Sequence, residues 1–106
     1  MSSLAPKLRI LHLEDSELDH ELALVHLQRG GLDVSVQRVE SRQEFEAALD
    51  EHWDAILSDY NLPGFSGIQA LQIVRARDST IPFILVSGEI GEDVAVAAMR
   101  SGASDY

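Results

Sequence analysis

The sequence predicts an α/β fold in which helices cover both faces of a doubly wound parallel sheet. Two observations lead to this prediction. Short aliphatic segments alternate with segments of helical periodicity, one pair for about every 25 residues. The aliphatic segments are almost continuously apolar, as expected of strands that are buried on both faces of a parallel sheet. Right-handed connections between such strands give an open, doubly wound sheet.

The first third of the chain supplies two strands and a helix. Residues 8–13 are short and mostly apolar, which predicts a buried strand. A helical pattern begins after Ser16 and ends at the glycine pair 30–31, a common C-terminal signal. Residues 32–39 alternate between apolar and polar side chains and predict a second strand. The residues that define the helical spacing are Leu18, Leu22 and Val25.

The middle of the chain predicts a second helix and a third strand. Residues 41–44, Ser-Arg-Gln-Glu, match a capping box and open a helix with Phe45 on its apolar face. Residues 54–58 predict a buried strand that ends at Asp59. Residues 62–64, Leu-Pro-Gly, predict a turn.

The last third repeats this order. Residues 66–69, Ser-Gly-Ile-Gln, form a second capping box at the start of a helix. After Pro82, residues 83–86 predict the fourth strand, and residues 92–100 predict a final helix. The third predicted helix has its apolar side chains at Ile68, Leu71 and Val74.

Polar side chains stand at the carboxyl ends of three of these strands. Glu14 and Asp15 follow the first strand, Asp59 ends the third, and the hydroxyl of Ser87 follows the fourth. Doubly wound sheets bind ligands beyond this edge. Carboxylates that meet there repel one another unless a cation such as Mg²⁺ neutralises them. Taken singly, Asp15 can cap a helix and Asp59 can start a turn, but their joint placement favours an anionic Mg²⁺ site.

Composition excludes several classes of function. The chain has 106 residues, enough for one domain, and a net charge of −10. Direct binding of nucleic acid is not expected, because it needs clustered lysine and arginine. The chain has no cysteine and no apolar run that could span a membrane, and we expect it to be cytoplasmic. His12 lies on the first predicted strand and is interpreted as a packed core residue.

Four segments carry a more specific signal. Residues 57–67 contain Asp-x-x-x-Pro-Gly-x-x-Gly, which begins at Asp59 and directly follows a strand. Residues 11–16, 82–88 and 98–106 read Leu-His-Leu-Glu-Asp-Ser, Pro-Phe-Ile-Leu-Val-Ser-Gly and Ala-Met-Arg-Ser-Gly-Ala-Ser-Asp-Tyr. In order and spacing, these segments resemble the receiver domains of two-component response regulators over essentially the whole chain. The resemblance implies a flavodoxin-like receiver fold over residues 1–106.

The resemblance also implies a role for each candidate residue. Asp59 would be the phosphoacceptor, consistent with the competence of aspartate as a nucleophile in phosphoryl transfer. Ser87 would be the switch hydroxyl and Tyr106 the aromatic switch. The Mg²⁺ ligands would be Asp15, Asp59, the backbone carbonyl of Asn61 and, through water, Glu14.

One departure from the family pattern concerns the C-terminal part. Family members continue into a fifth strand, which carries a lysine that pairs with the phosphate, and then into a fifth helix. The sequence stops at Tyr106, so we expect a C-terminally incomplete domain without that lysine. The open strand edge and uncovered apolar sheet that would result favour self-association.

Three functions fit these observations. The first is a signalling switch that accepts a phosphoryl group from a histidine kinase or histidine phosphotransfer protein, catalyses only its own phosphorylation and dephosphorylation, and acts on an output protein or domain. The second is an aspartyl-nucleophile phosphatase or phosphotransferase, which would generally carry an acid where this chain has Asn61. The third is a pseudo-receiver that acts as an interaction module without phosphorylation.

Overall fold

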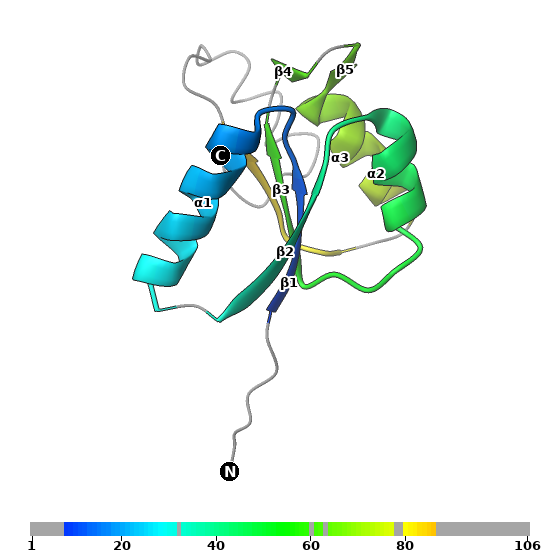
Figure 1. Ribbon diagram of the computed structural model, residues 1–106. Helices are drawn as coiled ribbons and strands as arrows, with labels where there is room; N and C mark the ends of the chain where they lie inside the picture. The colour runs from blue at the N-terminus through cyan, green and yellow to red at the C-terminus, as the bar shows by residue number, and fades with distance from the viewer. Residues whose placement is uncertain (1–7, 32, 60, 63, 78–79, 87–106) are drawn as a thin grey trace.

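A four-stranded parallel sheet forms the centre of the molecule (Figure 1). The structure is a computed structural model that describes residues 8–31, 33–59, 61–62, 64–77 and 80–86. The strand order is β2-β1-β3-β6, so the direction of winding reverses between β1 and β3. The parallel sheet predicted from the sequence is therefore confirmed. The strands are β1 (Leu8–Leu13), β2 (Val34–Val39), β3 (Ala55–Asp59) and β6 (Phe83–Val86).

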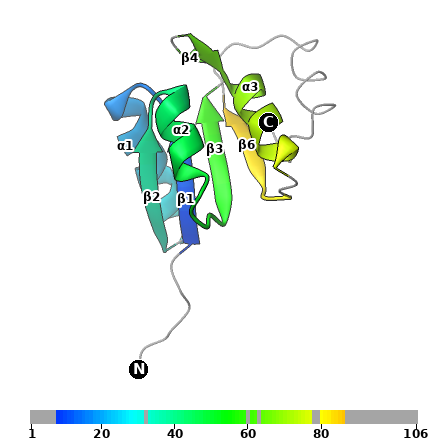
Figure 2. The ribbon, with the colours of Figure 1, turned by 90° about the vertical axis from the view of Figure 1, so that its right-hand side faces the viewer.

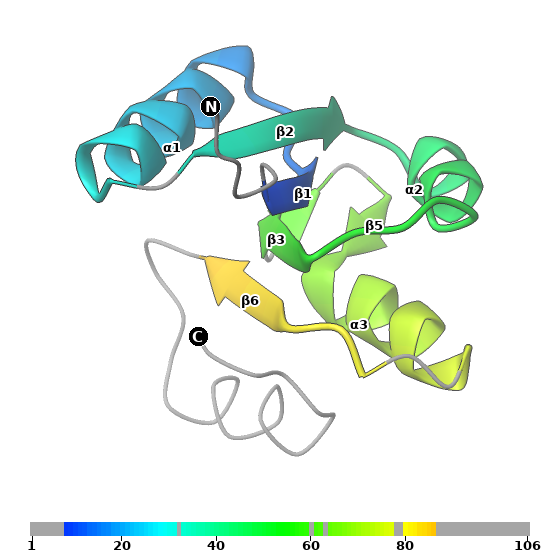
Figure 3. The ribbon, with the colours of Figure 1, turned by 90° about the horizontal axis from the view of Figure 1, so that it is seen from below.

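Within the described residues, three helices flank this sheet, and each has a serine as its N-cap. They are α1 (Glu17–Arg29), α2 (Arg42–Ala48) and α3 (Gly67–Ala76), with N-caps Ser16, Ser41 and Ser66. Figure 3 shows α1 on one side of the sheet and α2 and α3 on the other. The helix predicted over residues 92–100 lies outside the described residues.

The two predicted capping boxes differ in detail. At α3, Ser66 and Gln69 each bind the other's backbone N–H, as a full capping box requires. At α2, Ser41 accepts from the backbone N–H of Glu44, but the Glu44 carboxylate accepts from the N–H of Glu40 instead. The helix starts where the sequence predicts it, but the backbone N–H that the Glu44 carboxylate accepts from lies one residue before the N-cap.

The main apolar core lies between the sheet and the pair α2 and α3, which Figure 2 shows side by side in front of the strands. Phe45 and Phe83 are fully buried there, and Trp53 is buried with its indole N–H donating to the carbonyl of Ala48 at 2.7 Å. A short antiparallel pair, β4 (Asn61–Leu62) and β5 (Phe65–Ser66), joins β3 to α3. Other core members from the sheet are Leu11, Leu13, Val39, Ile56 and Leu85.

The face that carries α1 is much less closed. The residues that predicted this helix remain exposed, with Leu18 at 65% and Leu22 at 50% of full exposure. No residue of α1 is buried. In the part of the chain that the structure describes, no helix has the length and apolar character needed to cross a membrane.

Candidate functional site

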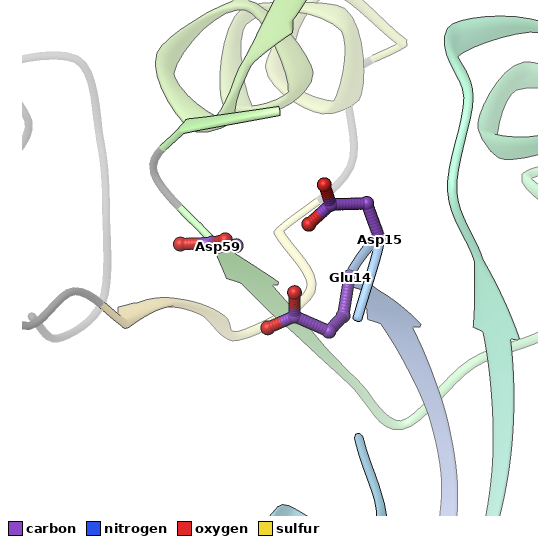
Figure 4. Close-up of side chains that lie close together, drawn as sticks. All are labelled: Glu14, Asp15 and Asp59. Atoms are coloured by element: carbon purple, nitrogen blue, oxygen red, sulfur yellow. The ribbon is translucent and has the colours of Figure 1, made fainter. Parts of the chain in front are cut away.

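Three carboxylates meet at the carboxyl edge of the sheet (Figure 4). Glu14 and Asp15 directly follow β1, and Asp59 is the last residue of β3. The two strands are hydrogen-bonded neighbours, with Leu13 paired to Ser58, so their ends lie side by side. One oxygen from each of the three carboxylates lies within 4.8 Å of the others. The convergence of these residues was predicted from the sequence alone.

Glu14 is the most strongly perturbed member of this acidic cluster. It is buried, and burial is the largest cause of the rise in the pKa of its carboxyl group to about 7. The backbone N–H of Ser16 donates to this carboxylate at 3.1 Å and partly opposes the rise in pKa. The charge of Asp59 adds to the rise. Without a cation, the cluster therefore binds a proton at Glu14 near neutral pH.

Asp59 is positioned through its own backbone carbonyl. The hydroxyl of the buried Ser58 donates to this carbonyl at 2.9 Å. At the start of α3, a Cβ added to Gly67 would lie 2.6 Å from the same oxygen and 2.6 Å from a methyl carbon of Leu85. Only glycine allows the helix to approach this closely. Sequence reasoning found Gly67 as part of a motif but gave it no role, and it missed Ser58.

The other predicted site residues divide into two groups. Asn61 is two residues beyond Asp59 in the sequence. It begins β4, where it pairs with Ser66 of β5. Ser87 and Tyr106 lie outside the described residues. The N-cap of α1 is Ser16 rather than Asp15, which leaves the Asp15 side chain in the acidic cluster.

His12 is packed, as the sequence predicts. It is buried on β1, and its Nδ1 lies 2.8 Å from Nδ1 of His20 on α1. The pKa of His12 is lowered to about 4, mainly by burial and also by the nearby charges of His20 and Arg38. His12 is therefore a neutral partner of the helix and is not a member of the acidic cluster.

The donor set of the acidic cluster fits a small, hard divalent cation. All three side chains offer carboxylate oxygens, and their mutual repulsion would be relieved by two positive charges. Asp15 is exposed and Asp59 is partly exposed, so that water and an incoming ligand can reach the cation. Mg²⁺ typically binds one or two carboxylates and keeps several waters, which agrees with this mixture of burial and access.

Comparison with known proteins points to one family. The family described as "Response regulator receiver domain" matches residues 10–106. Response regulator protein FleR of Pseudomonas aeruginosa is 34% identical over 99 residues, which cover 92% of this chain and 20% of FleR. Transcriptional regulatory protein PrrA of Mycobacterium tuberculosis is 30% identical over 92 residues, 83% of this chain and 39% of PrrA. The chain thus spans about a fifth to two fifths of these curated relatives.

Solved structures share the fold. The receiver domain of sensor histidine kinase PA1611 from Pseudomonas aeruginosa, which has a magnesium ion coordinated in its active-site cleft, superposes with a TM-score of 0.77 at 25% identity. The match covers 95% of this chain and 84% of that one. The phosphorylated cyanobacterial phytochrome response regulator RcpA gives a TM-score of 0.83 at 24% identity, covering 95% and 79% of the two chains.

Proposed function

This chain belongs to the response regulator receiver domain family, and we propose that Asp59 is its phosphoacceptor. The donor would be the phosphohistidine of a histidine kinase or of a histidine phosphotransfer protein. Members of this family are signalling modules of two-component systems rather than conventional enzymes. The observation that carries the proposal is the meeting of Glu14, Asp15 and Asp59 at one sheet edge.

Within this proposal, Asp59 is the nucleophile. One of its carboxylate oxygens attacks the phosphorus atom, the P–N bond to the donor imidazole breaks, and the electron pair leaves with the imidazole nitrogen. The product is an acyl phosphate on Asp59. Glu14, Asp15, Asp59 and the backbone carbonyl of Asn61 would hold Mg²⁺, with Glu14 acting through water. The ion would supply charge neutralisation between the attacking carboxylate and the phosphoryl oxygens.

The buried position of Glu14 gives this site a further property. Burial is the main cause of the rise of its pKa to about 7, so that near neutral pH the binding of Mg²⁺ would compete with partial protonation of this carboxyl group. This supports a cation-dependent site over a set of surface carboxylates.

Downstream of Asp59, we place Ser87 and Tyr106 as the residues that relay phosphorylation to an output protein or domain. The negative charge added to Asp59 would draw the hydroxyl of Ser87 toward the phosphoryl oxygens. We also propose that the receiver domain extends over residues 1–106. It would act in the cytoplasm, without contact to nucleic acid or membrane.

Self-association is also proposed, and the exposed apolar side chains of the α1 face support it. Leu8, Leu18, Leu22, Val25 and Val86 are each at least 39% exposed. Large apolar patches on a protein surface commonly mark contacts with another chain. A second copy that covered this face would remove these side chains from water.

The central test is chemical labelling of Asp59. Incubation with phosphoramidate and Mg²⁺ is expected to add the mass of one phosphoryl group, and the gain should be lost in Asp59→Asn and after removal of Mg²⁺ with EDTA. Asp54→Asn is a suitable control because Asp54 lies at the opposite end of the same strand and bonds to the backbone N–H of Arg9. Labelling that persists in Asp59→Asn would refute the assignment, and no labelling in the unmodified chain would favour a pseudo-receiver.

A further inference from the structure

The residue that opens the acidic loop is held from the neighbouring strand through both of its backbone groups. The N–H of Glu14 donates to the carbonyl of Val39 at 2.9 Å, which extends the pairing of β1 with β2. The carbonyl of Glu14 accepts from Nη1 of Arg38 at 3.2 Å. Because Asp15 follows directly, these two bonds fix the point from which the metal-binding side chains depart.

Arg38 is itself well placed to act as a tether. It lies in β2 beside His12 of β1, and only 26% of its side chain is exposed. The same Nη1 donates to the carboxylate of Glu40 at 2.9 Å, which orients the guanidinium toward the end of β1.

We propose that Arg38 is a positioning residue for the metal loop, because its guanidinium holds the Glu14 carbonyl and thereby sets the Glu14 and Asp15 carboxylates against Asp59. The inference rests on the proposed Mg²⁺ site. Arg38 does not contact the cation in this arrangement. It acts on the loop from β2, through the backbone carbonyl of residue 14, which is present whatever the side chain at that position.

Two effects of Arg38 on Mg²⁺ affinity oppose each other. Its positive charge close to the acidic cluster repels a dication, so removal of the charge alone should tighten binding. Its bond to the Glu14 carbonyl organises the ligands in advance, so loss of the bond should weaken binding. The sign of the change in affinity therefore separates a positioning role from a purely electrostatic one.

The experiment is calorimetric titration of Mg²⁺ into the unmodified chain, R38M, R38K and R42M. We expect R38M to weaken binding by about tenfold, as is typical for residues that support metal ligands from outside the coordination shell. R38K should retain most of the affinity because its ammonium can still donate to the carbonyl. R42M is the matched control, because it removes one positive charge just as R38M does, but from an exposed ion pair with Glu46 on α2. The Mg²⁺ affinity of R42M should change little.

A second readout does not depend on the metal. Amide hydrogen exchange at Asp15 and Ser16 should be faster in Mg²⁺-free R38M than in the unmodified chain, with the α3 amides unchanged. Unchanged or tighter Mg²⁺ binding in R38M would overturn the inference, as would equal weakening in R42M. Failure of the unmodified chain to bind Mg²⁺ would instead refute the metal site itself, and the two failures are therefore distinguishable.

Discussion

The two faces of the sheet differ in how completely their apolar side chains are buried. On β6, the alternate residues Phe83 and Leu85 point into the core with α2 and α3 and are almost completely buried. Ile84 is only partly buried, and Val86 is 51% exposed, on the opposite face. The same strand therefore contributes to a closed core on one side and to a half-open surface on the other.

The half-open face also carries two polar side chains in the middle of the sheet. Arg38 and His12 are paired across β2 and β1, and their row continues to Leu57 and Ile84. Charged groups lose solvation when they are buried, so a face that carries them cannot be closed with apolar side chains without a large cost. We infer that the α2–α3 face provides most of the stability, whereas the α1 face leaves several apolar side chains exposed.

The sharpest test of this division uses two neighbours on β6. Phe83→Ala should lower the free energy of unfolding by about 3–5 kcal/mol, since it empties a fully enclosed position. Ile84→Ala removes a partly exposed side chain on the other face and should cost about 1–2 kcal/mol. Urea denaturation followed by circular dichroism measures both. Equal losses would show that the two faces contribute equally and would break the comparison.

A second test concerns the close approach of α3, on the closed face, to the Asp59 carbonyl. Gly67→Ala should cost about 1–3 kcal/mol, because the new methyl group would overlap the Asp59 carbonyl and Leu85. It should also slow phosphorylation of Asp59, since the strand end must move to make room. Gly30→Ala is the matched control: at Gly30 a Cβ would meet only ordinary contacts at 3.5 Å, at a φ of −74°. A neutral Gly67→Ala would show that α3 can move away without consequence.

At the carboxyl edge of the sheet, the acidic loop should impose a pH-dependent cost on folding. The folded state raises the pKa of Glu14 from 4.5 to about 7, so the folded chain holds a proton that the unfolded chain has released between these values. Stability from this group is therefore fully present below about pH 4.5 and declines as the pH rises to about 7. Glu14→Gln removes the decline. In EDTA at pH 8 it should raise the free energy of unfolding by about 1–3 kcal/mol.

The pH profile provides the control for this prediction. Near pH 4.5 the difference between Glu14→Gln and the unmodified chain should almost vanish, and thermal unfolding at several pH values follows it directly. Saturating Mg²⁺ should also reverse the order at pH 8, because the unmodified chain gains a bound cation that the variant binds less well. A constant difference at every pH would mean that the burial of Glu14 does not perturb its titration.

The closed face was also the more predictable of the two. Continuous aliphatic strands and capping serines identified every described long element, and the family motif identified Asp59, because these signals are local in sequence. The acidic cluster followed from one topological rule about strand ends. The roles of Gly67 and Arg38 could not be predicted, since each depends on a close approach between segments that no sequence spacing encodes. The bond from Ser58 to the Asp59 carbonyl is local, but a serine in a strand does not reveal which acceptor its hydroxyl uses. Likewise, the spacing of Leu18 and Leu22 predicts a helix but does not show whether that side of it is covered.

The smallest expected effect on stability comes from the exposed stripe of α1. Leu18→Gln combined with Leu22→Gln should change the free energy of unfolding of the monomer by no more than about 0.5 kcal/mol per site, since both side chains are at least half exposed. The same double variant should dissociate any self-associated form that uses this face, because it replaces two of the exposed apolar side chains of α1. Sedimentation velocity over a range of concentrations separates the two effects, and Ala47→Gln on the exposed surface of α2 is the control on the opposite face.

Association that survives the double variant would show that the contact between copies does not involve α1. A large loss of monomer stability would show that this stripe is packed against the protein, and that the two faces are more alike than their exposure indicates.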